Sequence, residues 1–141
     1  MPLFAKVSTG IPSLDEIIDF LRMGDNVVWQ ADSVEDYRRF VVPYVRRALA
    51  DKRRVVYMRF AHHEALLAPD DGIAVYRLEA DAGFESFSSQ VHNIITREGR
   101  DVFYVFDSLS DLLMAWATDL MIGNFFAITC PYLFELNTVA Y

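Results

Sequence analysis

The sequence predicts an α/β fold in which a largely parallel sheet is covered by helices on both faces. Short apolar runs rich in β-branched and aromatic residues alternate with longer segments whose apolar residues recur at helical spacing. This alternation is typical of right-handed β-α-β units, which place their strands parallel in one sheet. The chain has 141 residues, 53% of them hydrophobic, so we assign 1–141 to a single domain with a buried core.

The first half of the chain is predicted to hold two helices and two strands. Residues 13–16, SLDE, fit a capping box, and the apolar residues after them predict a helix over 14–22. Residues 27–30 form a short run of β-formers and predict a buried strand. Ser33 is predicted to cap the helix that follows, and the next strand is expected over 55–60.

The second half continues the same alternation. The pattern predicts, in order, a strand over 73–78, a helix over 84–98, a strand over 102–106, a helix over 119–136 and the beginning of a strand over 138–141. The final residues are apolar and carry no polar tail. We therefore expect the sheet to be truncated at its C-terminus and the chain to be an N-terminal excerpt of a longer one.

Composition excludes several classes of protein. A net charge of −7 argues against a nucleic-acid binder, whose affinity depends on neutralising phosphates with Lys and Arg. No apolar stretch reaches the length of a membrane span, and the first residues lack the pattern of a secretory signal. The single cysteine, Cys130, excludes an internal disulfide or a multi-cysteine metal site. These features predict a cytoplasmic protein that binds neither nucleic acid nor membrane.

One segment departs from the acidic balance. Between Val34 and Arg54 there are seven basic residues and three acidic ones. Two interpretations remain open for this segment: a solvated helix face, or a docking surface for an acidic partner or a neighbouring domain.

Ligands of an open parallel sheet bind beyond the carboxyl ends of its strands. The residues expected at that edge are Ala31, Asp32 and Ser33, then Ala61, His62 and His63, and finally Asp107 and Ser108. His62 and His63 lack the i,i+4 spacing that places two metal ligands on one helix face, so we expect structural or partner contacts from them.

Two segments resemble a known family. Residues 8–18, STGIPSLDEII, resemble the opening of RecA/KaiC-like ATPase domains, which commonly begin with a TGIPGLDEIL-type segment. Residues 102–109, VFYVFDSL, resemble the Walker B strand of the same family. The resemblance implies a RecA-like three-layer domain in which the turn after residues 27–30 occupies the place of the P-loop. Residues 1–30 also resemble the leading domain of phosphoenolpyruvate synthase/pyruvate phosphate dikinase-like proteins, whose catalytic modules come later in the chain.

Carried over to this sequence, the resemblance implies that the catalytic equipment is mostly missing. The loop glycine falls at Ala31, and the Gly-Lys-Thr triplet falls at Asp36, Tyr37 and Arg38. The place of the carboxylate that activates water falls at Ala61 and His62. Only Asp107, on the magnesium side, is retained, and its alternative interpretation is a structural hydrogen bond at a strand end.

The resulting hypothesis is a degenerate, non-catalytic RecA/KaiC-like domain that serves as an interaction or regulatory module of a larger phosphotransferase. It predicts no catalytic residue and no cofactor, and the expected partners are downstream domains of the same chain or a second copy. The alternative is a working ATPase that binds ATP and magnesium, with Asp107 on the metal and Ser33 and Arg38 on the nucleotide. A third possibility is a small-ligand sensor that uses the acidic turn and His62.

Overall fold

A four-stranded parallel sheet forms the centre of the computed structural model, which describes residues 5–116 and 119–141. The strands run in the spatial order β4-β3-β5-β6. Their bounds are Val55–Arg59 for β3, Ile73–Arg77 for β4, Phe103–Asp107 for β5 and Val139–Ala140 for β6. The fold class is therefore α/β with a mostly parallel sheet, as the alternation of apolar runs predicts.

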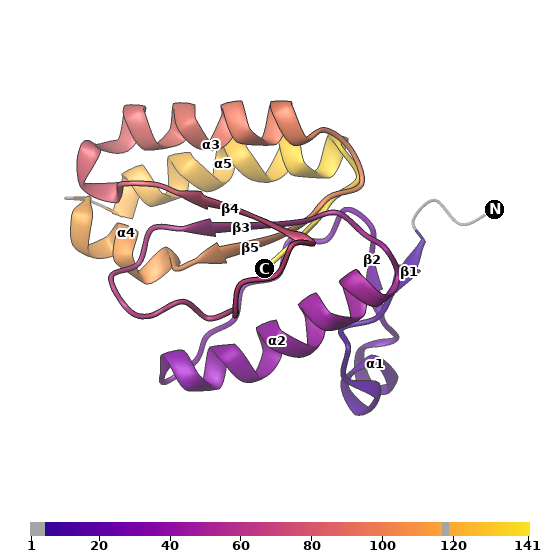
Figure 1. Cartoon of the computed structure of the whole chain (residues 1–141). Coiled ribbons are helices and arrows are strands. Elements are labelled where there is room, and N and C mark those ends of the chain that lie inside the picture. The colour runs from indigo at the N-terminus through magenta and orange to yellow at the C-terminus, as the bar shows by residue number, and fades with distance from the viewer. Residues whose placement is uncertain (1–4, 117–118) are drawn as a thin grey trace.

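Helices cover both faces of this sheet (Figure 1). Helix α2 (Val34–Ala50) lies on one face, and α3 (Phe84–Glu98) and α5 (Asp119–Glu135) lie on the other. The strand side chains alternate between the two layers: Val55 and Tyr57 pack with the α2 core, whereas Val56 and Met58 pack with the α3 and α5 core. Burial on both faces explains why the central strands β3 and β5 appear in the sequence as nearly continuous apolar runs.

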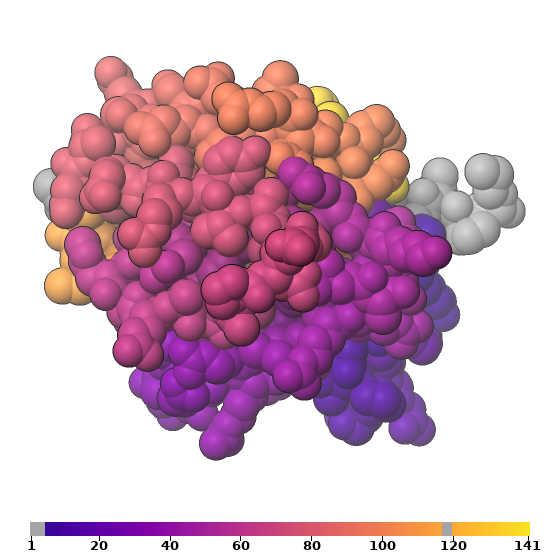
Figure 2. All heavy atoms as spheres, viewed as in Figure 1, coloured from indigo at the N-terminus to yellow at the C-terminus, as the bar shows by residue number. Residues whose placement is uncertain are grey.

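The chain before α2 forms a small subregion at one end of the molecule. Strands β1 (Lys6–Val7) and β2 (Leu21–Arg22) pair antiparallel, and α1 (Pro12–Ile18) connects them. In the space-filling view this region lies against the residues of α2 (Figure 2). The predicted helix over 14–22 is wrong at both ends. Asp19 and Phe20 adopt left-handed backbone angles, with φ of 57° and 66°, and turn the chain into β2.

The predicted capping box is also wrong. The N-cap position of α1 is Ile11, which provides no side-chain hydrogen bond. Asp15 instead accepts hydrogen bonds from the Thr9 amide at 2.7 Å, from the Thr9 hydroxyl at 2.6 Å and from the Ser8 hydroxyl. Burial raises the pKa of Asp15, but these hydrogen bonds outweigh it and the net pKa is lowered. Asp15 therefore stabilises the turn before α1 by accepting hydrogen bonds from Ser8 and Thr9.

Residues 27–30 do not form the predicted strand. The sheet contact of this segment is one parallel bridge between Asn26 and Ala140, together with a 2.8 Å hydrogen bond from the Val27 amide to the Ala140 carbonyl. Strand β6 has two residues and offers few backbone partners. The segment is instead held by side-chain packing: the ring of Trp29 stacks on the ring of Phe40 in α2, with centroids 4.2 Å apart.

The other predicted strands and helices are confirmed to within a few residues. The sequence did not predict α4 (Leu109–Ala115) or the 3-10 helix η1 (Ala80–Ala82). Residues 1–4, part of the stretch that resembles the phosphotransferase leading domain, lie outside the described residues. Within 5–116 and 119–141, no helix has both the length and the apolarity needed to cross a membrane.

Candidate functional site

A cleft of about 570 Å³ opens beyond the carboxyl ends of the strands. Its walls come from residues 27–34, from the beginning of α4 and from α5. Of the residues expected at this edge, Ala31, Asp32, Ser33, His63 and Ser108 line the cleft. The structure therefore brings the acidic turn, the loop after β3 and the end of β5 together, as expected for a parallel sheet.

The turn that leads into α2 is organised by its own side chains. The Ser33 hydroxyl accepts a hydrogen bond from the Asp36 amide at 3.1 Å, which confirms Ser33 as the N-cap. Glu35 and Asp36 lie in the first turn of the helix, where their negative charge complements the positive end of the helix dipole. The protein's own side chains thus cap one amide of this helix end and supply negative charge beside it, both of which a bound phosphate would otherwise do.

The charge of the cleft is unsuited to phosphate. Two carboxylates, Asp32 and Asp111, line it together with His63, and its described lining includes no lysine or arginine. Most of the remaining lining is apolar or aromatic, including Trp29 and Phe106. A polyphosphate placed here would meet like charges in a partly apolar environment, which raises the cost of binding.

Arg38 does not face this cleft. Its guanidinium donates to the Leu66 carbonyl at 3.2 Å and to the Ala65 carbonyl at 3.3 Å, and it also pairs with Glu35. The side chain therefore fixes the loop after β3 to the outer surface of α2. Tyr37, which the resemblance aligns with the phosphate-binding lysine, lines the cleft and donates its hydroxyl to the Phe106 carbonyl at 3.2 Å. Burial raises the pKa of Tyr37, which keeps the hydroxyl neutral.

Asp107 lies beneath the cleft, and none of its surface is exposed. Its Oδ2 accepts a hydrogen bond from the Tyr57 hydroxyl at 2.5 Å, and its Oδ1 lies 2.8 Å from Nε2 of His63. The Tyr57 hydroxyl in turn accepts the Leu66 amide at 2.9 Å. Burial raises the pKa of Asp107 above its ordinary value, although the Tyr57 hydrogen bond and the nearby His63 act in the opposite direction.

His63 links Asp107 to the cleft. Its Nδ1 lies 2.7 Å from the Glu64 carbonyl oxygen, and its Nε2 faces the Asp107 carboxylate. The Glu64 carbonyl can only accept, so Nδ1 carries a proton in this contact. Nε2 lies within ion-pair distance of the carboxylate, but neither Nε2 nor Oδ1 of Asp107 has a hydrogen-bond partner among the described residues. His63 is therefore positioned between the Glu64 backbone and the buried carboxylate.

The histidine expected in the cleft was His62, and this expectation is wrong. The His62 side chain is exposed, and its backbone amide donates to Asp111 at 3.1 Å. Two adjacent histidines in a loop carry no periodicity, so no sequence pattern indicates which of their side chains faces the cleft. Tyr57 was likewise absent from the predicted site, because it appeared in the sequence only as one residue of an apolar strand.

The described residues do not fit a magnesium nucleotide at this site. Asp107 is fully buried, with Oδ2 bonded to Tyr57 and Oδ1 facing His63, and Arg38 is directed away from the cleft. Across the described parts of the chain, no three His, Cys, Asp or Glu side chains converge as a metal-binding group. In comparisons with known proteins, no protein-family model and no curated protein matches the chain.

Proposed function

We propose that this chain is a non-catalytic RecA/KaiC-like domain that acts as an interaction or regulatory module of a cytoplasmic phosphotransferase. The observation that carries the proposal is the state of Asp107, the one acid retained from the Walker B-like segment. It is fully buried, its Oδ2 accepts a hydrogen bond from Tyr57, and its Oδ1 faces His63 at 2.8 Å. A carboxylate buried in this way connects the end of β5 to the loop after β3 and is not exposed to a ligand in the cleft.

The turn in the place of the P-loop supports the same conclusion. A P-loop holds phosphates with free backbone amides and a lysine. Here the Asp36 amide is hydrogen-bonded to the Ser33 hydroxyl, and the residue that aligns with the lysine is the neutral Tyr37. The protein's own carboxylates supply the negative charge that the helix end favours.

An interaction role is supported by the apolar surface beside the cleft. Leu113 and Met114 of α4 and Leu120 of α5 are exposed, Met114 at 89%. Clustered exposed apolar side chains of this kind commonly mark contact surfaces. The proposed partners are downstream domains of the same chain or a second copy. The resemblance of residues 1–30 supports the part of the proposal that assigns the domain to a phosphoenolpyruvate synthase/pyruvate phosphate dikinase-like protein.

The competing proposal is an ATPase in which Asp107 holds magnesium and an arginine replaces the lysine. A steady-state assay of ATP hydrolysis with magnesium distinguishes the two proposals. We expect the wild-type chain and the Asp107→Asn variant to give the same background rate, because neither positions a nucleotide. A saturable ATPase activity in the wild type that Asp107→Asn abolishes would overturn the proposed function.

A further inference from the structure

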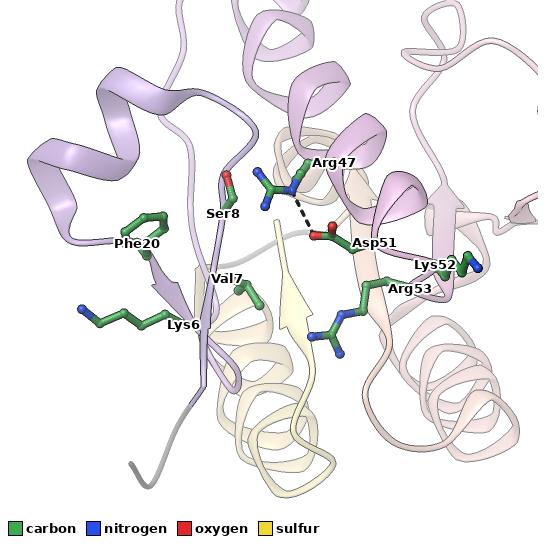
Figure 3. A pocket seen from close by; sticks show the side chains of 8 residues that line it. All are labelled: Lys6, Val7, Ser8, Phe20, Arg47, Asp51, Lys52 and Arg53. Carbon is green, nitrogen blue, oxygen red and sulfur yellow. Dashed lines mark hydrogen bonds and ion pairs between the residues drawn. The ribbon is translucent and has the colours of Figure 1, made fainter. Parts of the chain in front are cut away.

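A second cavity, of about 530 Å³, lies at the opposite end of α2 from the acidic turn. It is formed between β1 and the residues that end α2 (Figure 3). Four cationic side chains line it, and Asp51 is the one carboxylate in its lining. The cationic residues are Lys6, Arg47, Lys52 and Arg53. In a chain of net charge −7, this groove is a local concentration of positive charge.

Two of these cations are already paired. Lys6 lies 2.9 Å from a carboxylate oxygen of Asp19, and the Nε of Arg47 lies 3.0 Å from Asp51. Lys52 and Arg53 have no carboxylate within ion-pair distance in the described parts of the chain. The guanidinium of Arg53 lies over the ring of Phe103, 5.5 Å from its centroid, a contact that orients the group and leaves its charge uncompensated.

Cations at a helix C-terminus often serve only to bond the last carbonyl groups. Here backbone amides do so: Asp51 donates to the Arg47 carbonyl, Arg53 to the Ala48 carbonyl and Lys52 to the Leu49 carbonyl, at 3.0, 2.8 and 3.0 Å. The side chains of Arg47 and Arg53 are therefore free of that role. Figure 3 shows both guanidinium groups extending from the end of α2 toward β1, where Val7 lies between them and Lys6.

We propose that this groove binds a small oxyanion of the phosphate class, held by the guanidinium groups of Arg47 and Arg53. A guanidinium presents two parallel N–H donors that match the oxygens of a phosphate group. Lys6 on the opposite wall is paired with Asp19 and extends away from the two arginines, so the anion contacts are assigned to the arginines alone. The apolar side chains of Val7 and Phe20 form a surface for the organic part of a phosphate ester. This proposal concerns the end of α2 remote from the cleft and does not depend on the proposed function.

The test is a titration of the ¹⁵N-labelled chain with sodium phosphate, and separately with sodium pyrophosphate, against sodium chloride at equal ionic strength. Saturable shifts are expected at the amides of Val7 and Arg53 and not at those of Ser33 and Asp36. A saturable response to phosphate indicates a site for a single phosphate group, whereas a response to pyrophosphate alone indicates a site for a diphosphate; either supports the proposal.

Two variants with equal changes in charge make the test specific. Arg53→Gln removes an unpaired cation of the groove and is expected to weaken binding by at least about tenfold, because it removes a charge-assisted pair of N–H donors to the anion. Arg46→Gln removes an exposed cation of α2 that does not line the groove, and is expected to change the affinity by less than about twofold.

Three results would overturn the proposal: shifts no larger than those with chloride, equal losses in the two variants, or saturable shifts at Ser33 and Asp36. Equal losses of affinity in the two variants would indicate that the anion responds to the general positive charge of this region and not to a defined site. Binding at Ser33 and Asp36 would also count against the proposed function, whereas the other two results would leave that function unaffected.

Discussion

Replacing Asp107 with alanine is expected to lower the free energy of unfolding by about 2–4 kcal/mol, because the groups that face the carboxylate lose their partner in a buried environment. The substitution leaves Nε2 of His63 and the hydroxyl hydrogen of Tyr57 without an acceptor in a buried environment. The loop after β3 loses its attachment as well, because Tyr57 also accepts the Leu66 amide. Urea denaturation of the wild type and the variant measures the difference.

Asp107→Asn is the matched control for this prediction. The amide retains the shape of the side chain and an acceptor oxygen for Tyr57, so we expect a smaller loss, about 1–3 kcal/mol. An Asp107→Ala variant within about 1 kcal/mol of the wild type would contradict the structural role given to this carboxylate.

The wild type and the Asp107→Asn variant also test whether the pKa of Asp107 is raised. Between the ordinary value of 3.8 and the raised value, the folded state holds a proton that the unfolded state has lost. Wild-type stability should therefore fall as pH rises through that window, relative to the stability of Asp107→Asn, which has no such proton. If wild-type stability instead rose with pH relative to that of Asp107→Asn, the pKa of Asp107 would be lowered and not raised.

Gly10→Ala is the second substitution with a large expected effect. Gly10 adopts φ of 83°, and a Cβ built there would lie 2.1 Å from the backbone oxygen of Pro43 in α2. The left-handed conformation costs an alanine about 1–2 kcal/mol, and forcing the backbones apart adds about 1–3 kcal/mol. We therefore expect the free energy of unfolding to fall by about 2–5 kcal/mol.

Gly123→Ala is the control for the glycine prediction. Gly123 lies inside α5, and a Cβ there would meet no heavy atom within 4 Å. Alanine favours the helical conformation, so this variant should be stabilised by up to about 1 kcal/mol. Thermal melting of the two variants beside the wild type measures both effects. A Gly10→Ala variant as stable as the wild type would contradict the close contact between the turn before α1 and α2.

The layered fold could be predicted from the sequence because its evidence is local. The strands over 55–60 and 102–106 are buried on both faces, so they appear as apolar runs that only Arg59 interrupts. The apolar run at residues 27–30 misled for a physical reason. Packing of Val27 and Trp29 on the core beside α2 requires apolar side chains whether or not the backbone joins the sheet. The helix over 14–22 failed because left-handed residues at Asp19 and Phe20 carry no sequence signal comparable to glycine.

In the candidate site, too, local features could be predicted from the sequence and contacts between distant residues could not. Ser33 could be predicted as a cap because its partner, Asp36, lies three residues away. The partners of Asp107 could not be predicted, since Tyr57 is separated from it by 50 residues and is brought near only by the pairing of β3 with β5. The direction of Arg38 likewise depends on the loop carbonyls at Ala65 and Leu66.

The central claim is that the turn in the place of the P-loop is held by its own cap and takes no magnesium nucleotide. The most direct measurement is a titration of the ¹⁵N-labelled Arg53→Gln variant with magnesium-ATP, in which the basic groove contributes least. We expect the amide chemical shifts of residues 31–37 to stay unchanged up to millimolar nucleotide, because the Asp36 amide remains hydrogen-bonded to the Ser33 hydroxyl. Saturable, magnesium-dependent shifts of these amides would contradict the account.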